Sequence, residues 1–261
     1  MISPLAVSAQ VVFIYMTLLF FLALLLKDNS IVDIGWGIGF IVVVWTLTFF
    51  HPESFAAKHL IQFFTTLWGT RLAAHIGMRN MGRGEDFRYA QWRKAWGRAF
   101  WWRSYLQVFM LQGLLMLVIS LPAIVLFAGG PRPLGRWGGM GAFVFLFGFL
   151  FETVADFQLK RFVKDPANRG RLMTSGLWAW SRHPNYFGEA VLWWGLFLVS
   201  VDSSNGWLAL LSPVTITVLV RWVSGVPLLE KKWAGRPDFE EYKKRVPVFL
   251  PFIPRRVPFH K

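Results

Sequence analysis

The segment GLWAWSRHPNYFGEAVLWWG, residues 176–195, sets a group of polar side chains directly before a long apolar run. Arg182, His183, Asn185 and Glu189 all fall within it. Polar and ionisable groups at the start of such a run are costly in lipid, and they mark functional sites when they occur there. The segment therefore indicates a membrane helix whose polar end binds a ligand.

The composition of the whole chain also indicates a membrane protein. Of the 261 residues, 55% are hydrophobic and 18% aromatic, and the mean hydropathy of +0.44 is high for a soluble domain. A bilayer core of about 30 Å requires roughly 20 mostly apolar residues per helix. Runs of that kind predict an all-α polytopic protein, one domain over 1–261, with seven transmembrane helices at about 5–26, 31–50, 59–78, 105–128, 138–159, 186–203 and 205–224.

The distribution of Lys and Arg predicts the orientation of these helices. With the N-terminus outside, the inside segments hold 24 basic residues and the outside segments hold 3. Basic residues accumulate on the cytoplasmic side, so we expect the N-terminus out and the C-terminus in. This bias and anionic lipids account for the net charge of +14, and nucleic acid is not an expected partner. We expect a monomer.

The absence of cysteine excludes several kinds of site. Without a thiol the chain has no disulfide, no thiolate metal ligand and no cysteine nucleophile. The five histidines show no spacing typical of a metal site. We therefore expect no metal.

Two polar groups lie near the cytoplasmic ends of the second and third predicted helices. Asp33 lies about one turn inside the second helix, where a carboxylate is functional or is neutralised near the headgroups by Lys27. The run from Glu85 to Tyr89 follows two glycines after the third helix. The basic stretch 93–98 beyond it is typical of an amphipathic helix that touches lipid phosphates.

A third polar group surrounds the opening segment. Glu152, Asp156 and Lys160 follow one another at four-residue intervals, so they share one helix face. Asn185, Glu189 and Trp193 share a face of the next helix in the same way. The intervening loop supplies several guanidinium groups, which bind phosphate oxygens in pairs. Trp178 and Trp180 have an alternative interpretation as an aromatic belt at the headgroups.

These motifs together resemble the steroid 5α-reductase family. The resemblance rests on SRHPNYFGE at 181–189, on Asp156 with Lys160, and on Trp193, Arg221 and the terminal Pro-Phe-Ile-Pro at 251–254. The runs SIVDIGWG at 30–37 and GEDFRY at 84–89 are similar to its bacterial branch, DUF1295. The resemblance implies a seven-helix membrane oxidoreductase that uses NADPH to reduce a carbonyl-conjugated C=C bond in a lipophilic substrate. A 3-oxo-Δ4 steroid is the expected substrate, and another enone or a long-chain lipid is the alternative. The resemblance to the bacterial branch also implies a bacterial inner membrane, with the cofactor site on the cytoplasmic side.

The resemblance also implies roles for particular residues. The nicotinamide end of NADPH would lie near Asn185, Glu189 and Trp193, with Asp156 on ribose or amide groups. The animal enzymes engage the 3-keto group with a Gln-Glu pair and a tyrosine, which this chain lacks. Asp33, kept protonated by an apolar site, is the expected proton donor, with Tyr89 or Glu85 in reserve, and Trp36 and Trp68 are the expected substrate contacts. The remaining expected cofactor contacts are Lys160, Arg171, Arg182, His183, Tyr186 and Arg221.

Two other functions compete with reduction. Membrane isoprenylcysteine methyltransferases carry a related RHPxYxG…E block, here residues 182–189, and use it to bind S-adenosylmethionine, which has no phosphates. A lipid-binding or transport protein could instead hold headgroups at the same polar end. The many guanidinium groups, the acid at Asp156 and the length of seven spans favour NADPH over S-adenosylmethionine. A lipid-binding protein would bind neither cofactor.

Overall fold

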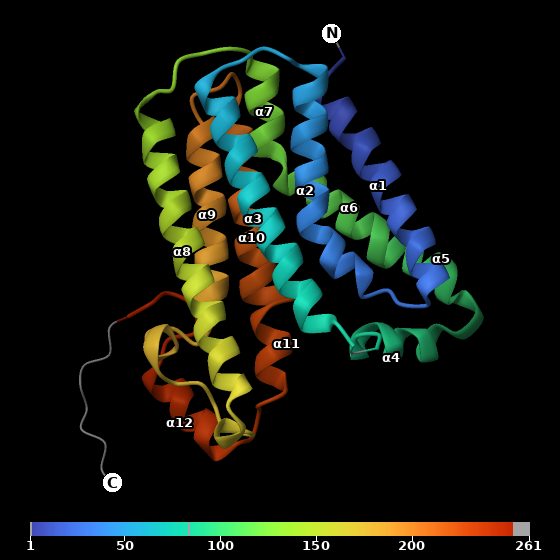
Figure 1. Ribbon diagram of the computed structural model, residues 1–261, viewed down its shortest axis with the longest axis vertical. Helices are drawn as coiled ribbons and strands as arrows, with labels where there is room; N and C mark the ends of the chain where they lie inside the picture. The colour runs from blue at the N-terminus through green and yellow to red at the C-terminus, as the bar shows by residue number, and fades with distance from the viewer. Residues whose placement is uncertain (1, 83, 253–261) are drawn as a thin grey trace. The chain divides into compact units, whose positions relative to one another are not determined.

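The computed structural model describes residues 2–82 and 84–252. Helices account for 78% of these residues, and no strand occurs among them. The predicted all-α class is confirmed. Positions 253 and 254 of the terminal motif lie outside the described residues. Figure 1 shows the α-helices, which are α1 (Pro4–Leu26), α2 (Ile31–Phe50), α3 (Ala56–Asn80), α4 (Phe87–Trp96), α5 (Phe100–Ser104), α6 (Leu111–Ile119), α7 (Leu121–Gly129), α8 (Arg136–Lys164), α9 (Pro184–Ser200), α10 (Leu211–Val218), α11 (Val226–Lys231) and α12 (Pro237–Arg245).

Several helical stretches are long and apolar enough to cross a membrane, as an integral membrane protein requires. In the described part of the chain there are five: Pro4–Leu26, Ile31–Phe50, Phe87–Ile119, Arg136–Lys164 and Gly206–Lys231. Of the other two predicted spans, α3 contains Lys58 and Arg71, and α9 has 17 residues, or about 26 Å of helix. Seven crossings and the orientation of the termini stay predictions.

The structure divides the predicted helix over 105–128 into pieces. A π-helical segment, Tyr105–Met110, leads into α6, and α7 begins after Ser120. Pro122 stands in the first turn of α7. Because proline lacks an N–H and its ring clashes with the carbonyl four residues earlier, it cannot continue α6.

By its internal contacts the chain forms two compact units. Unit 1 comprises residues 1–139 and 196–212, and unit 2 comprises 140–195 and 213–261. The single domain expected from the sequence stays a prediction. Each unit is described separately below.

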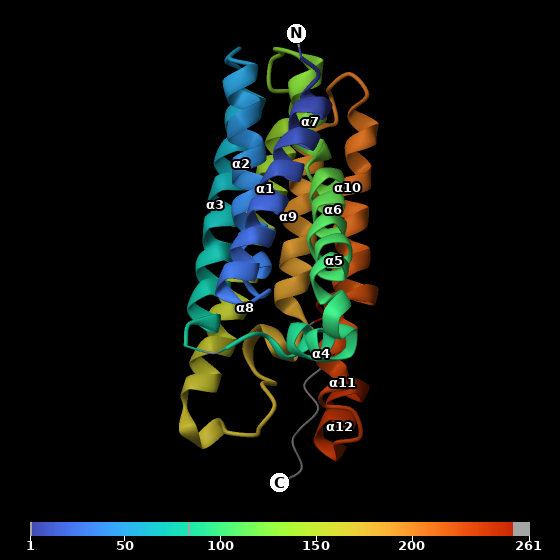
Figure 2. The same ribbon diagram turned by 90° about the vertical axis from the view of Figure 1, so that its right-hand side faces the viewer.

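In unit 1, α2 packs against both α1 and α3 (Figures 1 and 2). The contact with α3 is very close, because a Cβ atom on Gly69 would lie 2.5 Å from the carbonyl oxygen of Gly37. Both views show α4 running across the direction of these three helices. Side chains of α4 therefore contact the first turn of α2, where Asp33 lies.

In unit 2, glycines bring α8 and α9 together. A Cβ atom on Gly148 would lie 2.5 Å from the backbone nitrogen of Leu192, and one on Gly188 would lie 2.5 Å from that of Glu152. Backbones can approach this closely only where side chains are absent. The close packing sets the acids of α8 against the polar start of α9.

Candidate functional site

Asp33 lies in the first turn of α2 and is held by two donors from α4. Arg88 Nη2 donates to Asp33 Oδ2 at 2.8 Å, and the hydroxyl of Tyr89 donates to Oδ1 at 2.7 Å. Tyr89 is buried, with 3% of its surface exposed. The environment of Asp33 is thus polar as well as apolar, whereas the sequence suggested an apolar site alone.

Asp86 fixes the start of α4 and the orientation of Arg88. Its carboxylate accepts bonds from the backbone nitrogen and from Nε of Arg88, at 3.0 and 2.9 Å. Its own backbone N–H donates to Ser30 Oγ at 2.7 Å. Burial raises the pKa of Asp86, but the hydrogen bonds and the charge of Arg88 outweigh it and hold the pKa below its ordinary value.

Glu85 is occupied by a different set of partners. Arg93 binds both of its oxygens, with Nε at 2.9 Å and Nη2 at 2.7 Å, and the backbone N–H of Asn29 donates at 2.9 Å. A carboxylate held in this bidentate way is strongly fixed. Glu85 therefore fits a structural role at the start of α2 better than the expected role of an alternative proton donor.

An aromatic row joins the two predicted substrate contacts in unit 1. The rings of Trp36 and Phe40 meet edge to face with centroids 5.4 Å apart, and Phe40 meets Trp68 in the same way at 5.5 Å. Trp68 is fully buried. Asp33 lies one turn before Trp36 on α2, so four of the five predicted catalytic and substrate residues belong to one contiguous region.

In unit 2, Asp156 of α8 pairs with Asn185 of α9. Asn185 Nδ2 donates to Asp156 Oδ1 at 3.1 Å. The carbonyl oxygen of the Asn185 amide is buried and accepts no hydrogen bond in the described part of the chain. Trp193, two turns further along α9, is also buried. A buried acceptor without a hydrogen bond costs free energy, and a donor group of a ligand could remove that cost by binding this oxygen.

Arg182 and His183 both bind Glu230 of α11. Arg182 Nε donates to Glu230 Oε1 at 2.8 Å, and His183 Nε2 lies 3.1 Å from the same oxygen. Arg182 Nη1 also donates to the carbonyl of Val246 at 2.9 Å. Most donors of the Arg182 guanidinium are thus used within the chain, whereas the sequence suggested a phosphate ligand.

His183 and Tyr186 form a flat pair at the start of α9. Their rings are stacked, with centroids 5.8 Å apart and an interplanar angle of 13°. His183 is buried, and its Nδ1 has no hydrogen-bond partner among the described residues. This nitrogen is the second buried polar atom in the region that a ligand could satisfy.

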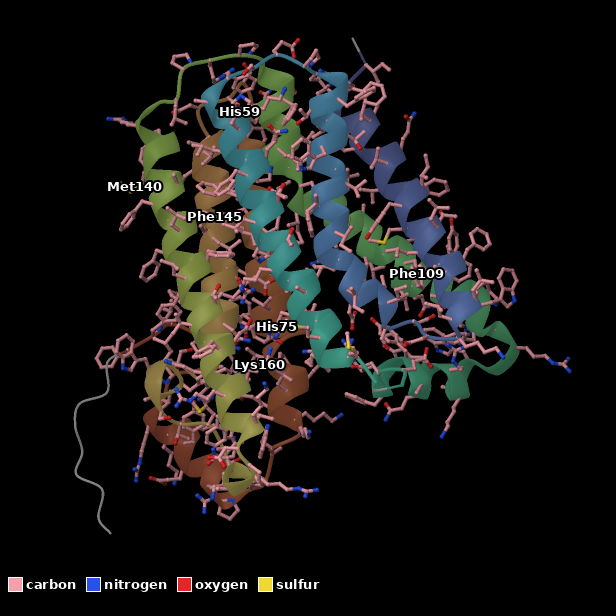
Figure 3. The ribbon with its side chains drawn as sticks, viewed as in Figure 1. His59, His75, Phe109, Met140, Phe145 and Lys160 are labelled. Atoms are coloured by element: carbon pink, nitrogen blue, oxygen red, sulfur yellow. The ribbon has the colours of Figure 1, made fainter. Side chains whose placement is uncertain are left out.

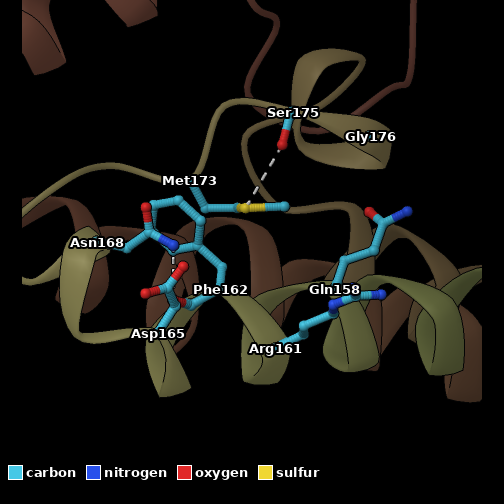
Figure 4. Close-up of a pocket in the computed structure, with 8 residues that line it drawn as sticks. All are labelled: Gln158, Arg161, Phe162, Asp165, Asn168, Met173, Ser175 and Gly176. Carbon is cyan, nitrogen blue, oxygen red and sulfur yellow. Dashed lines mark hydrogen bonds between the residues drawn. The ribbon is translucent and has the colours of Figure 1, made fainter.

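The end of α8 and the loop after it carry a group of cations, which we call the basic loop. Lys160, labelled in Figure 3, and Arg171 are exposed. A pocket of about 360 Å³ lies beside the end of α8 (Figure 4), and Arg161, Phe162, Asp165 and Met173 are among the residues that line it. No ion pair in the described part of the chain involves the members of this group, which are Lys160, Arg161, Lys164, Arg169 and Arg171.

Arg221 lies apart from the basic loop in the sequence, within the π-helical turn Leu219–Val223. Its guanidinium lies 5.1 Å from the ring centroid of Trp222, and it is half-buried. Arg221, a predicted phosphate contact, thus has an aromatic neighbour, and it forms no ion pair among the described residues.

Comparison with known proteins identifies the family. A family model described as "Protein of unknown function (DUF1295)" matches residues 19–246. The chain belongs to this family. DUF1295 includes steroid 5α-reductase-like proteins, as the motifs suggested. No solved structure has a significant match to the chain.

Two relatives of this DUF1295 protein are similar to it over different shares of the chain. An uncharacterised protein of Schizosaccharomyces pombe is 26% identical over 279 residues, which cover 95% of this chain and 80% of that protein. A probable O-methyltransferase of Ustilaginoidea virens, ustE, is 34% identical over 90 residues, 34% of this chain and 32% of its own. The chain thus matches about a third of the second relative.

The sequence did not predict two of the ion-pair partners that the structure shows at these sites. Arg88 bridges Asp33 and Asp86, and Glu230 receives both Arg182 and His183. The run GEDFRY contained a signal for Arg88, because an arginine beside two acids and a tyrosine is a natural ion-pair partner. Glu230 lies 48 residues from Arg182, and no spacing rule connects them.

Proposed function

We propose that this DUF1295 protein is an NADPH-dependent reductase of a carbonyl-conjugated C=C bond in a lipophilic substrate, with a 3-oxo-Δ4 steroid as the first candidate. The unpaired cations of the basic loop carry the proposal, because a dinucleotide phosphate needs such donors. The proposed setting is a bacterial inner membrane, with unit 2 binding the cofactor from the cytoplasmic side.

The residues of unit 2 suit the cofactor chemically. The unsatisfied oxygen of Asn185 would accept from a carboxamide or a ribose hydroxyl, and Asp156 would fix the Asn185 amide. Lys160 and Arg171 would hold phosphates, with Arg221 as a further cation. Glu189, Trp193 and the stacked pair of His183 and Tyr186 would complete the site. Bound NADPH supplies a hydride to the β-carbon of the enone.

Unit 1 would supply the proton and orient the carbonyl group. Reduction of an enone places negative charge on the carbonyl oxygen, which a nearby donor stabilises. The Tyr89 hydroxyl donates a 2.7 Å hydrogen bond to Asp33, so in this proposal Tyr89 gives its hydroxyl proton to the substrate and the Asp33 carboxylate holds Tyr89 in place. Trp36 and Trp68 would form the apolar wall for the substrate. In this proposal Glu85 has no chemical role, because Arg93 and Asn29 already bind it.

Methyl transfer is the second candidate. The observation that favours it is the 34% identity to a probable O-methyltransferase over 90 residues. S-Adenosylmethionine carries no phosphate, so that function leaves the basic loop without a ligand. For this reason we rank it below reduction.

Thermal unfolding of the detergent-purified chain with NADPH, NADH and S-adenosylmethionine tests the proposal. A ligand that binds only the folded state at 100 times its Kd stabilises it by about 2.7 kcal/mol. NADPH should raise the Tm of the wild type and of Gln10→Ala, a control on an exposed amide of α1, but not that of Asn185→Ala. A shift with S-adenosylmethionine alone supports methyl transfer, and no shift with any ligand favours a lipid-binding protein.

Turnover separates cofactor binding from chemistry. We expect NADPH oxidation with a 3-oxo-Δ4 steroid and none with the saturated 3-oxo steroid, which has no conjugated double bond. If NADPH binds but no steroid enone is consumed, a screen of non-steroid enone lipids follows. Failure of all enones would reject the reduction.

A further inference from the structure

The segment from α4 through α5 has an unusual composition. Residues 87–104 contain five cations, Arg88, Arg93, Lys94, Arg98 and Arg103, and four tryptophans, with no acidic residue. The segment crosses the direction of α1, α2 and α3 (Figures 1 and 2). It then continues into the apolar helices up to Ile119. A cationic, aromatic helix before a membrane span is placed to lie at a bilayer surface.

The five cations divide into two sets. Arg88 and Arg93 have carboxylate partners within unit 1, Asp33 and Glu85. The other three, Lys94, Arg98 and Arg103, have no ion-pair partner in the part of the chain that the structure describes. Lys94 and Arg98 are exposed. These three charges are therefore available to an external anion.

Exposed tryptophans lie in the same segment as the three unpaired cations, and one of them contacts Arg103. Trp101 has 61% of its surface exposed and Trp102 has 41%, and the guanidinium of Arg103 lies 5.4 Å from the Trp102 ring centroid. Trp92 stacks on Trp96 at 5.4 Å. Exposed indole rings are stable at the level of lipid headgroups, where one side is apolar and the other is wet.

We propose that this α4–α5 surface, formed by Lys94, Arg98, Arg103, Trp92, Trp101 and Trp102, binds the phosphodiester groups of anionic phospholipids. The unpaired cations complement the lipid charge. The exposed tryptophans and the adjoining apolar helix point to a lipid over a soluble anion, because a soluble anion gains nothing from apolar surroundings. The inference does not depend on the proposed reductase activity.

Lipid binding to the purified full chain tests this proposal. The protein is equilibrated in micelles with equal amounts of phosphatidylglycerol and phosphatidylcholine of the same acyl chains, and the bound lipids are counted by native mass spectrometry. Each cation near an anionic surface contributes about a fivefold preference. Wild type should therefore prefer phosphatidylglycerol, and the variant Lys94→Gln/Arg98→Gln/Arg103→Gln should lose most of that preference.

Two further variants keep the test decisive. Lys231→Gln/Lys232→Gln/Lys244→Gln removes three exposed cations elsewhere and should keep the preference. Lys94→Arg/Arg98→Lys/Arg103→Lys conserves the charge and should also keep it. The proposal is overturned if the Gln variant, folded as shown by its melting curve, retains the wild-type preference. It is also overturned if soluble glycerol phosphate abolishes the preference at constant ionic strength.

Discussion

Arg88 of α4 and Asp33 of α2 form a 2.8 Å ion pair between residues 55 positions apart in the sequence. The same guanidinium donates to Asp86, the residue that caps α4. One side chain thus joins the start of α4 to the first turn of α2, and it fixes the Asp33 carboxylate that accepts the hydrogen bond of Tyr89.

Replacement of Arg88 should therefore destabilise the fold and misplace Asp33. Arg88→Gln leaves two carboxylates without their charged donor, and hydrogen bonds to charged groups contribute about 1.5–3 kcal/mol each. We expect a loss of that order in the free energy of unfolding, measured by denaturant titration in detergent. Lys94→Gln removes an exposed charge from the same helix and should change stability by less than about 0.5 kcal/mol. Equal effects of the two variants would contradict the bridging role.

Tyr89→Phe and Asp33→Asn test the proton donor. Both changes preserve shape while they remove the hydroxyl or the acid. If the proposed reduction is correct, turnover should fall by roughly 10²–10⁴-fold, whereas the Tm shift caused by NADPH should stay at its wild-type value. Glu85→Gln is the comparison, because its partners indicate a structural role, and its turnover per folded molecule should stay within a few-fold of wild type. Normal turnover in Asp33→Asn would remove Asp33 from the mechanism.

The sequence predicted the local parts of these sites better than the long-range parts. The four-residue spacing placed Asp156 on the inner face of α8 and Asn185 at the start of α9, and these side chains meet. The pairing of Arg88 with Asp33 depends on the position of α4 across the start of α2, and the hydrophobic periodicity of the sequence does not predict that position.

Arg182 shows the same limit in unit 2. An arginine before a polar helix start is typical of a phosphate ligand. Its guanidinium instead binds Glu230 and the backbone after α12, because the chain beyond α12 returns to the start of α9. The backbone N–H of Arg182 likewise donates to the carbonyl of Pro247 at 2.9 Å. Only the fold of residues 230–247 could reveal this use of its donors.

Gly188 tests the close packing of α8 on α9. A Cβ atom there would lie 2.5 Å from the backbone nitrogen of Glu152, so Gly188→Ala forces the helices apart and should cost about 1–3 kcal/mol. Gly139 also lies on a helix, α8, but a Cβ atom added to it would have no neighbour within 4 Å among the described residues. Gly139→Ala should leave stability unchanged or raise it by up to about 1 kcal/mol. Only Gly188→Ala should lower the Tm, and an equal loss in both variants would contradict the close packing.

Glu230 tests how the last segment is held. Glu230→Gln weakens the bonds to Arg182 and His183, and the chain around Val246 should become more accessible. We expect faster cleavage after α12 by a low concentration of trypsin, with cleavage elsewhere unchanged. Glu241→Gln is the matched control, because Glu241 pairs with Arg245 at the surface. Equal cleavage of both variants would show that the bonds of Glu230 do not hold the segment after α12.

Asp86 gives a prediction for the dependence of stability on pH. The hydrogen bonds and charge of Arg88 hold its pKa in the folded state below the ordinary value, which is about 3.9 in the unfolded chain. A carboxyl with a lowered folded pKa stabilises the fold above its unfolded pKa, and that contribution disappears as the pH falls through the folded value. Asp86→Asn keeps a capping side chain but loses the charge. The variant should be less stable than wild type at pH 7 by about 1 kcal/mol, and the two unfolding curves should converge below about pH 4. A difference that persists unchanged at low pH would assign the effect to capping and not to the ion pair.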